Sequence, residues 1–552
     1  MMRQWFRSGT PWIWLTAGAV SLSLIMVVGL LILIAVRGLA HFWPSAVFEA
    51  HITDAQAADQ LIIGEIHDRE RILAQHLREA GITLQPTTGT WVERLLIKTG
   101  NRDASGQDFR WTLAQDLRDI KYPTDLAVVE RREWGNLYGR IVALKDNGQV
   151  VAEGAAAVNA LKERLPRTRE LVSQIRKIEK FDIGHINARI ERMRLKQRKL
   201  ELAQQFGAPQ RAELDAERAE AQMEFQELQT QLRKMAQDSL RDSAVVEISD
   251  GRRIDVPLGK WVNFYFPNDM NVVQKIGFYL AKAWEFVSDE PREANTEGGI
   301  FPAIFGTIMM VLVMSVLVTP FGVVAAVYLR EYAKQGVVTR LIRIAVNNLA
   351  GVPSIVYGVF GLGFFVYFLG GNIDQLFFPE ALPTPTFGTP GILWSSITLA
   401  LLTVPVVIVA TEEGLSRTPR AIREGSLALG ATQFETLWRT VIPMASPAIM
   451  TGLILAVARA AGEVAPLMLV GVVKLAPSLP LDGEFPYLHL DRKFMHLGFH
   501  IHDVGFQSPN IEAARPVVYA TALLLVLVVI LLNIGAIGIR NHLREKYRSL
   551  EH

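Results

Sequence analysis

The stretch 449–473, IMTGLILAVARAAGEVAPLMLVGVV, is long and apolar enough to cross a membrane, yet it carries Arg459 and Glu463 near its middle. A charge at the mid-depth of a bilayer is costly, so such residues usually serve a function. Their spacing of four predicts that both lie on one face of a helix, where each neutralises the other. Because a guanidinium stays charged and binds oxyanions bidentately, Arg459 is a candidate for an anion pathway. The alternative is a fixed ion pair that only holds helices together.

The composition of the 552-residue chain indicates membrane spans that alternate with a polar segment. Half of the residues are hydrophobic, a fifth are charged, the net charge is +2, and there is no cysteine. Disulfides, thiolate metal sites and thiol nucleophiles are therefore excluded. The net charge does not indicate a nucleic-acid partner. The Gly-x-x-x-x-Gly-Lys-Ser/Thr loop of many ATPases is absent from the sequence, so ATP hydrolysis is expected on a partner.

Six apolar stretches predict a polytopic, mainly α-helical membrane protein. The first follows Arg3 and Arg7 and is longer than the apolar core of a cleaved signal peptide, so we interpret it as a retained span. The predicted spans are 13–37, 302–328, 342–369, 391–411, 448–473 and 516–539.

Basic residues in the short connecting segments predict the orientation of the chain. Six crossings would put four basic segments on one side: Arg3 and Arg7; Arg330, Lys334, Arg340 and Arg343; Arg417, Arg420, Arg423 and Arg439; and Arg540, Arg544, Lys546 and Arg548. The loop 370–390 contains neither Lys nor Arg, as expected of the opposite side. Both termini and the loop 412–447 are therefore expected in the cytoplasm, and residues 38–300 outside it.

The polar insert between the first two spans contains two patterns typical of β-hairpins. LYGRIVAL and QVVAE flank Asn147-Gly148, and a second pair of β-prone runs flanks Asp250-Gly251. Farther along, the stretch 272–287, VVQKIGFYLAKAWEFV, is amphipathic and is expected close to the membrane surface.

Between the two hairpins, residues 155–243 are highly charged and carry apolar residues at near-heptad spacing. FGAPQ at 206–210 interrupts the pattern, so we expect an antiparallel coiled-coil hairpin. The expected seam residues are Val172, Ile175, Ile186, Ile190, Met193 and Leu200 on the first arm, and Ala221, Phe225, Leu228, Leu232 and Met235 on the second.

The segment AIREGSLALGATQFETLWRTVIPMASPAI reads as a short helix, a turn at Gly430, a second helix and a stop at Pro443. It resembles the EAA loop of ABC importer permeases, whose pattern is Glu-Ala-Ala, a Gly six residues after the Glu, and a closing Ile-x-Leu-Pro. Glu424, Gly430 and Pro443 are in register with that pattern. Gly425 and Ser426 occupy the two Ala positions, and Thr440 and Ile442 occupy the Ile and Leu positions. In that family the loop docks on the ATPase subunit.

Further stretches narrow the resemblance to the phosphate-specific ABC transporter permeases. They are GGIFPAIFGTIMM at 298–310, GVPSIVYGVFGLGFF at 351–365, LALGATQFETLWRTVIP at 427–443 and ARAAGEVAPLML at 458–469. The Gly-Glu-x-Ala-Pro run from Gly462 to Pro466 favours the PstA-type subunit over its PstC-type sister. The resemblance covers the first span and about 296–540, and it does not extend to the insert.

The resemblance implies a type I ABC importer permease fold with an added α+β insert. It assigns Arg459 and Glu463 to phosphate passage, and Glu424, Gly430 and Pro443 to coupling with the ATPase. The implied partners are a PstC-type sister permease, two ATPase subunits, a periplasmic phosphate-binding protein, phosphate and the lipid bilayer of a bacterial inner membrane. No cofactor, catalytic residue, metal ligand or nucleic acid is implied, and a cytoplasmic phosphate-signalling regulator stays an open possibility.

The expected organisation has four parts. Residues 1–37 form the cytoplasmic N-terminus and first span, 38–295 the periplasmic insert, 296–540 the permease core with the EAA loop at 412–447, and 541–552 a cytoplasmic tail.

Two other functions compete with phosphate import. The chain could carry another oxyanion such as sulfate or molybdate, or it could be a sensor or scaffold for phosphate signalling that uses its coiled coil. A metal site built from His489, His496, His500 and His502 with Asp491 and Asp503 is disfavoured, because their spacing fits no recognised zinc pattern.

Overall fold

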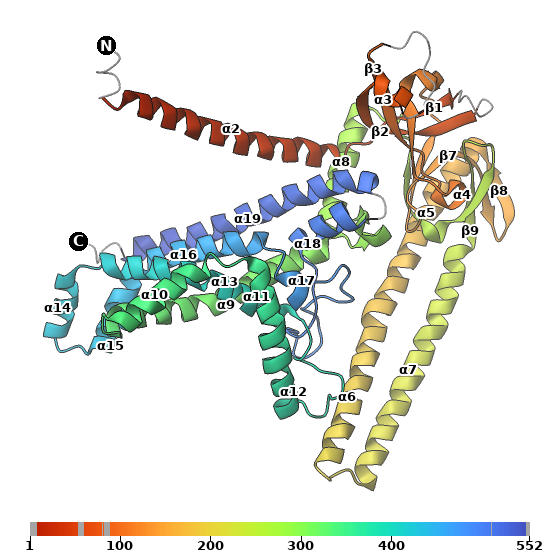
Figure 1. Cartoon of the computed structure of the whole chain (residues 1–552). Helices are drawn as coiled ribbons and strands as arrows, with labels where there is room; N and C mark the ends of the chain where they lie inside the picture. The colour runs from red at the N-terminus through yellow and green to blue at the C-terminus, as the bar shows by residue number, and fades with distance from the viewer. Residues whose placement is uncertain (1–7, 53–59, 80, 82–88, 509–510, 548–552) are drawn as a thin grey trace. The chain divides into compact units, whose positions relative to one another are not determined.

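The computed structural model describes residues 8–52, 60–79, 81, 89–508 and 511–547 (Figure 1). Arg3, Arg7 and Arg548, which were used to predict the orientation, lie outside these residues. The chain divides into two compact units. The membrane unit comprises Met1–His41, Val287–Glu290 and Ile300–His552, and the insert unit comprises Phe42–Phe286 and Pro291–Gly299.

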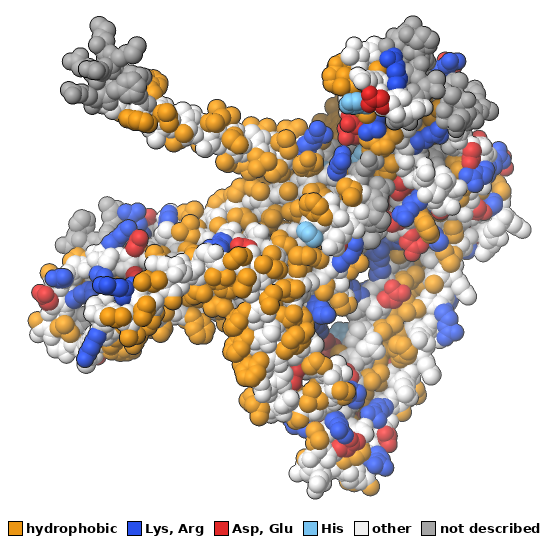
Figure 2. Space-filling model, in the orientation of Figure 1, with side chains coloured by type: hydrophobic (Ala, Val, Ile, Leu, Met, Phe, Trp, Pro, Cys, Tyr) orange, Lys and Arg blue, Asp and Glu red, His pale blue; other side chains and the backbone are white. Residues whose placement is uncertain are grey.

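The described residues contain six helices long and apolar enough to cross a membrane, which confirms the predicted number of spans and the mainly α-helical fold. Figure 2 shows hydrophobic side chains gathered over α2 and over the surface of the membrane unit. The spans are α2 (Thr10–Ala40), α9 (Phe301–Val327) with η5 (Tyr328–Tyr332), α11 (Ser354–Phe360) with η6 (Gly361–Gly370) and α12 (Gly371–Phe377), α13 (Ile392–Arg417), α15 (Gln433–Thr436) with η7 (Leu437–Val441) and α16 (Ile442–Gly462), and α19 (Ile511–Tyr547).

The third span begins later than the predicted 342–369. Residues 337–349 form a separate amphipathic helix, α10 (Val337–Leu349), and the span starts at Ser354. Pro353 explains the break, because proline disfavours helical backbone in the residue before it and cannot donate a hydrogen bond to the preceding turn.

The fifth span ends earlier than the predicted 448–473. Helix α16 stops at Gly462, and a short helix α17 (Leu467–Val470) follows. Pro466 has no N–H to bond the carbonyl of Gly462 four residues before it, which favours a helix end here. Proline alone does not decide the end, because α9 and α13 continue through Pro320 and Pro405. Two further short helical segments, α18 (Leu497–His502) and η8 (Asp503–Gln507), lead into α19.

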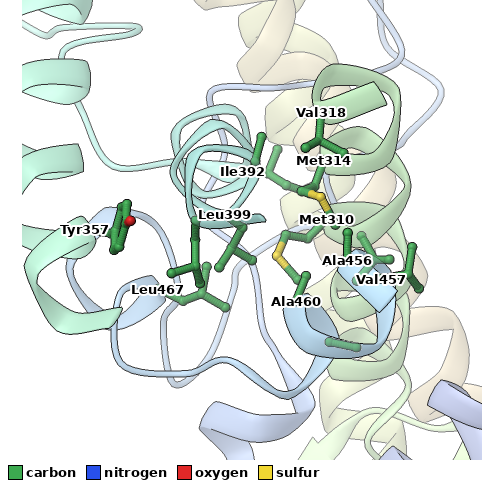
Figure 3. Close-up of a cluster of buried hydrophobic side chains, with 14 of the residues drawn as sticks. Met310, Met314, Val318, Tyr357, Ile392, Leu399, Ala456, Val457, Ala460 and Leu467 are labelled. Carbon is green, nitrogen blue, oxygen red and sulfur yellow. The ribbon is translucent and has the colours of Figure 1, made fainter. Parts of the chain in front are cut away.

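Helix α13 lies at the centre of the membrane unit between α9 and α16. Its side chains Ile392 and Leu399 join Met310 and Met314 of α9 and Ala456 of α16 in one buried cluster (Figure 3). A Cβ added to Gly452 of α16 would lie 2.6 Å from the Cβ of Ala410. Small residues therefore let the two helices approach closely, as is usual where lipid supplies no hydrophobic driving force.

The described residues of the insert unit form two large antiparallel sheets and one two-stranded sheet. The five-stranded sheet has the order β4-β3-β2-β1-β5, and the six-stranded sheet has the order β10-β9-β7-β6-β11 with β8 paired to β7. The strands are β1 (Val47–Ile52), β2 (Gln60–Leu73), β3 (Trp91–Lys98), β4 (Phe109–Leu113), β5 (Leu117–Lys121), β6 (Ala127–Arg131), β7 (Leu137–Asp146), β8 (Gln149–Glu153), β9 (Asp242–Glu247), β10 (Arg253–Pro257) and β11 (Trp261–Tyr265). Short elements complete the unit: α3 (Ala74–Glu79), α4 (Arg102–Ser105), η1 (Ala114–Asp116), η3 (Leu258–Lys260), η4 (Glu293–Asn295), and the pair β12 (Pro291–Arg292) and β13 (Glu297–Gly298).

Both predicted β-hairpins are present. Strands β7 and β8 pair across Asn147 and Gly148, whose φ angles of 48° and 81° are the positive values that a two-residue hairpin turn requires. Strands β9 and β10 pair across a loop in which Gly251 has a φ of 77°.

Two long helical arms leave and rejoin the six-stranded sheet (Figure 1). The first is α5 (Gly154–Lys177), η2 (Ile178–Asp182) and α6 (Ile183–Leu202), and the second is α7 (Ala208–Leu240). Ile186 and Met193 of the first arm are buried with Leu214 and Ala221 of the second. The two arms are separated at 203–207, which is earlier than the expected 206–210. Pro209 does not interrupt α7, because it lies in the first turn, where its missing N–H leaves no hydrogen bond unmade.

Candidate functional site

The loop between α13 and α16 is a helix–turn–helix. Helix α14 (Arg420–Ala428) ends in a turn at Gly430, where φ is 88°. The Gly430 N–H donates to the carbonyl of Leu427, and the Ala431 N–H donates to the carbonyl of Ser426. This pair of hydrogen bonds closes a helix with a left-handed residue after its C-terminus, a position that favours glycine. The backbone conformation at position 430 therefore favours glycine.

The second helix starts at a capping box. The Thr432 hydroxyl accepts from the Glu435 N–H at 3.2 Å, and the Glu435 carboxylate accepts from the Thr432 N–H at 2.9 Å. The hydroxyls of Ser426 and Thr436 lie 2.9 Å apart and join α14 to α15. The turn is thus held by specific local hydrogen bonds.

The predicted stop at Pro443 is wrong. The helix continues through Pro443 into the span, and the π-helical turn η7 precedes this residue. A π-turn adds one residue to a helical turn. The wider turn accommodates the proline ring and the hydrogen bond that proline cannot donate. The loop is therefore continuous with α16, and a displacement of α15 would be transmitted directly into the fifth span.

An ion pair that the motif did not predict ties this loop to α9. Arg423 of α14 lies 2.7 Å from Glu331 in η5, and it also donates to the carbonyl of Leu415 at 2.6 Å. Both side chains are partly buried, so the pair is less screened than a surface ion pair. In the sequence, Arg423 contributed only to the positive charge of the loop.

The loop exposes four apolar side chains, which we call the loop patch: Leu427, Leu429, Phe434 and Trp438. Leu429 is 91% exposed, and the rings of Phe434 and Trp438 are nearly parallel with centroids 6.3 Å apart. Glu424 is also exposed beside this patch. Exposed apolar side chains gathered in this way indicate a contact with protein or with lipid.

Arg459 and Glu463 lie together, but not as predicted. Only Arg459 is helical, because α16 ends at Gly462 and Glu463 has extended backbone. The Nε of Arg459 lies 3.6 Å from the Oε1 of Glu463, which is an ion-pair distance and longer than a normal hydrogen bond. The side chain of Arg459 is 34% exposed and that of Glu463 is 20% exposed. The end of α16 at Gly462, which the helical spacing could not reveal, therefore positions the carboxylate.

The histidines discussed above do not gather around a metal. Among the described residues there is no group of three or more His, Cys, Asp or Glu side chains that could hold one. His489 instead lies 2.8 Å from Asp482. His496 is buried, and its Nδ1 accepts from the Gly498 N–H at the start of α18. Burial lowers the pKa of His496 from 6.5 to about 4.

Residues 318–549 match the family described as binding-protein-dependent transport system inner membrane component. A phosphate transport system permease protein PstA of Mycobacterium leprae is 35% identical over 225 residues, which are 40% of this chain and 68% of the relative. The chain belongs to the PstA-type permease family.

The sequence similarity to these relatives covers only part of this chain. A PstA 1 protein of Mycobacterium tuberculosis is 38% identical over 185 residues, and the chain spans about half of its length (54%) and is itself covered to 34%. A crystal structure of the MetNI methionine ABC transporter aligns with 44% of this permease and 94% of the solved chain, at 17% identity and a TM-score of 0.33. Family membership makes this permease a multi-pass protein of the inner membrane.

Proposed function

We propose that this chain is the PstA-type permease subunit of an ATP-driven phosphate importer, and that it forms half of a heterodimeric pore. The observation that carries the proposal is the Arg459–Glu463 pair at the end of a membrane span. Arg459 lies in the last turn of α16, Glu463 follows the helix directly, and the two side chains are 3.6 Å apart.

The geometry of the pair suits transient binding of an anion rather than tight binding. At 3.6 Å the carboxylate leaves the guanidinium without a tight bidentate partner, so an incoming phosphate oxyanion can compete for its N–H donors. Glu463 neutralises Arg459 in the empty state and repels the anion after it binds. A second cationic residue from a PstC-type sister across a pseudo-two-fold axis would balance the charge of phosphate.

The loop patch is proposed to dock on an ATPase subunit. ATP binding would close two ATPase subunits, and the loop from Glu424 to Pro443 would carry this motion into α16. Arg423 and Glu331 would pass the same motion to α9. In this scheme the nucleotide is hydrolysed on the partner, and this chain is not itself an enzyme.

The proposed orientation places both termini and the coupling loop in the cytoplasm and residues 38–300 in the periplasm. The distribution of basic residues supports it. So does the position of α14 and α15 at the end of the membrane unit where α19 also ends (Figure 1). A periplasmic phosphate-binding protein would then deliver phosphate on the side of the insert.

Labelled-phosphate uptake tests the proposal in cells that lack the chromosomal copy and carry either the wild type or Arg459→Gln. We expect Arg459→Gln to abolish uptake at unchanged membrane abundance. Arg417→Gln is the matched control, because Arg417 forms the same i,i+4 pair with Glu413, at 3.7 Å, on the exposed end of α13. Uptake that survives in Arg459→Gln would mean that the pair only packs helices.

The same assay separates the competing functions. Excess unlabelled sulfate or molybdate should leave phosphate uptake unchanged, and inhibition by either would reassign the substrate. Deletion of 155–243 tests the sensor or scaffold function. Loss of the phosphate-starvation response with uptake preserved would show that the insert is regulatory, and loss of uptake in an assembled complex would show that it helps to receive the binding protein.

A further inference from the structure

Helix α8 (Val272–Ser288) carries an exposed apolar stripe made of Val273, Ile276, Leu280 and Trp284. Leu280 is 62% exposed and Trp284 is 71% exposed. With 3.6 residues per turn, these four side chains share an arc of roughly 80°, and no charged residue lies within it. An apolar helix face of this kind is unusual on the water-exposed surface of a domain.

The opposite face of α8 is packed and charged. Lys282 lies 2.5 Å from Glu130 of β6 and 2.6 Å from Glu285 of α8, and Arg292 lies 3.1 Å from Glu285. Tyr265 of β11 packs against Phe278. Helix α8 is thus fixed to the insert unit by one face, and this attachment holds the apolar stripe outward.

Chain connectivity places α8 close to two membrane spans. Phe42, two residues after the end of α2, packs against Tyr279 and Phe286 of α8. At its other end, only residues 289–300 separate α8 from the start of α9. The chain therefore keeps α8 within a short segment of the ends of two membrane spans.

We propose that α8 lies in the lipid–water interface and that its apolar stripe enters the boundary between headgroups and acyl chains, holding the insert at the bilayer surface. The occupant of the stripe is lipid. Continuity with α2 and α9 favours lipid over a protein partner, and an amphipathic helix with a tryptophan in its apolar face suits this depth. The proposal concerns the insert and does not depend on which anion is carried.

The absence of cysteine makes the test direct. Leu280→Cys and Ile276→Cys, each labelled with an environment-sensitive fluorophore in the full chain, are reconstituted in vesicles of phosphatidylethanolamine and phosphatidylglycerol with nitroxide-labelled lipids. The matched controls are Ala281→Cys and Gln274→Cys, which are exposed positions beside the stripe on the same helix. We expect at least twofold stronger quenching at 276 and 280 than at the controls, and strongest quenching by shallow nitroxides.

Two results would overturn the proposal. Equal, weak quenching at all four positions would place the stripe in water. A blue-shifted fluorophore at 280 that lipid nitroxides do not quench would show that protein covers the stripe instead. Neither result depends on phosphate uptake, so failure here is distinguishable from failure of the proposed transport function.

Discussion

The Nη1 of Arg423 lies 2.7 Å from both carboxylate oxygens of Glu331, so α14 of the loop between α13 and α16 is tied to the end of α9. Gln433 of α15 also donates to the backbone carbonyl of Glu331 at 3.4 Å. One residue at the end of the second span therefore contacts both helices of the loop. A displacement of the loop cannot leave α9 in place without breaking a charged hydrogen bond, which typically contributes about 1.5–3 kcal/mol.

Replacing Arg423 with Gln should weaken this connection and uncouple transport from ATP hydrolysis. We expect phosphate uptake to fall severalfold while the assembled complex keeps its ATPase activity, because the patch that would dock is unchanged. ATPase and uptake rates in proteoliposomes measure the two effects separately. Arg420→Gln on the same helix is the control, and the charge swap Arg423→Glu with Glu331→Arg should restore part of the uptake. Unchanged uptake in Arg423→Gln would show that the ion pair is only local.

Gly430→Val should abolish coupling while the chain still reaches the membrane. A β-branched residue at a φ of 88° costs about 1–2 kcal/mol or more, so the turn would change shape. Gly425→Ala is the matched control. Gly425 is helical and has open space around it, so alanine should be neutral or stabilise α14 by about 1 kcal/mol. Normal uptake by Gly430→Val at wild-type abundance would refute a role for the turn.

Gly452→Ala should lower the thermal stability of the membrane unit. The added methyl group would lie 2.6 Å from the Cβ of Ala410, so α13 and α16 must move apart, at a cost of about 1–3 kcal/mol. Gly535→Ala in α19 adds the same methyl group into open space and serves as the control. Melting of the detergent-solubilised protein, followed by size-exclusion chromatography, compares the two. Equal melting temperatures would mean that the helices do not pack this closely.

Stability should decline in acid because two histidines are buried in the neutral form. Burial lowers the pKa of His496 and of His500 to about 4, below the ordinary value of 6.5. The unfolded chain therefore takes up these protons first. Stability should be fully present above about pH 6.5 and fall between pH 6.5 and 4, by up to about 1.4 kcal/mol per pH unit for each proton.

His496→Asn tests this dependence, since asparagine can still accept the Gly498 N–H bond but does not titrate. The variant should show a shallower decline in melting temperature from pH 6.5 to 4. A slope as steep as that of the wild type would exclude His496 as a source of the acid sensitivity.

Features that depend on neighbouring residues could be predicted from the sequence. Length and hydropathy predicted six spans, and the Asn147-Gly148 dipeptide predicted a hairpin, because these properties arise within a few turns or residues. The same holds for Gly430, whose left-handed backbone follows from the end of one helix and the start of another.

The positions of helix ends and of paired charges were decided by the tertiary structure. Helical spacing placed Glu463 on the face of Arg459, but α16 ends at Gly462 and an extended backbone brings the carboxylate to the guanidinium. Pro466 alone does not fix this end, because α9 and α13 continue through Pro320 and Pro405. Pro443 was expected to stop a helix, yet a π-turn lets it pass. The Arg423–Glu331 pair joins residues 92 positions apart. No local pattern could reveal that pair, because which distant charges meet depends on how the helices pack.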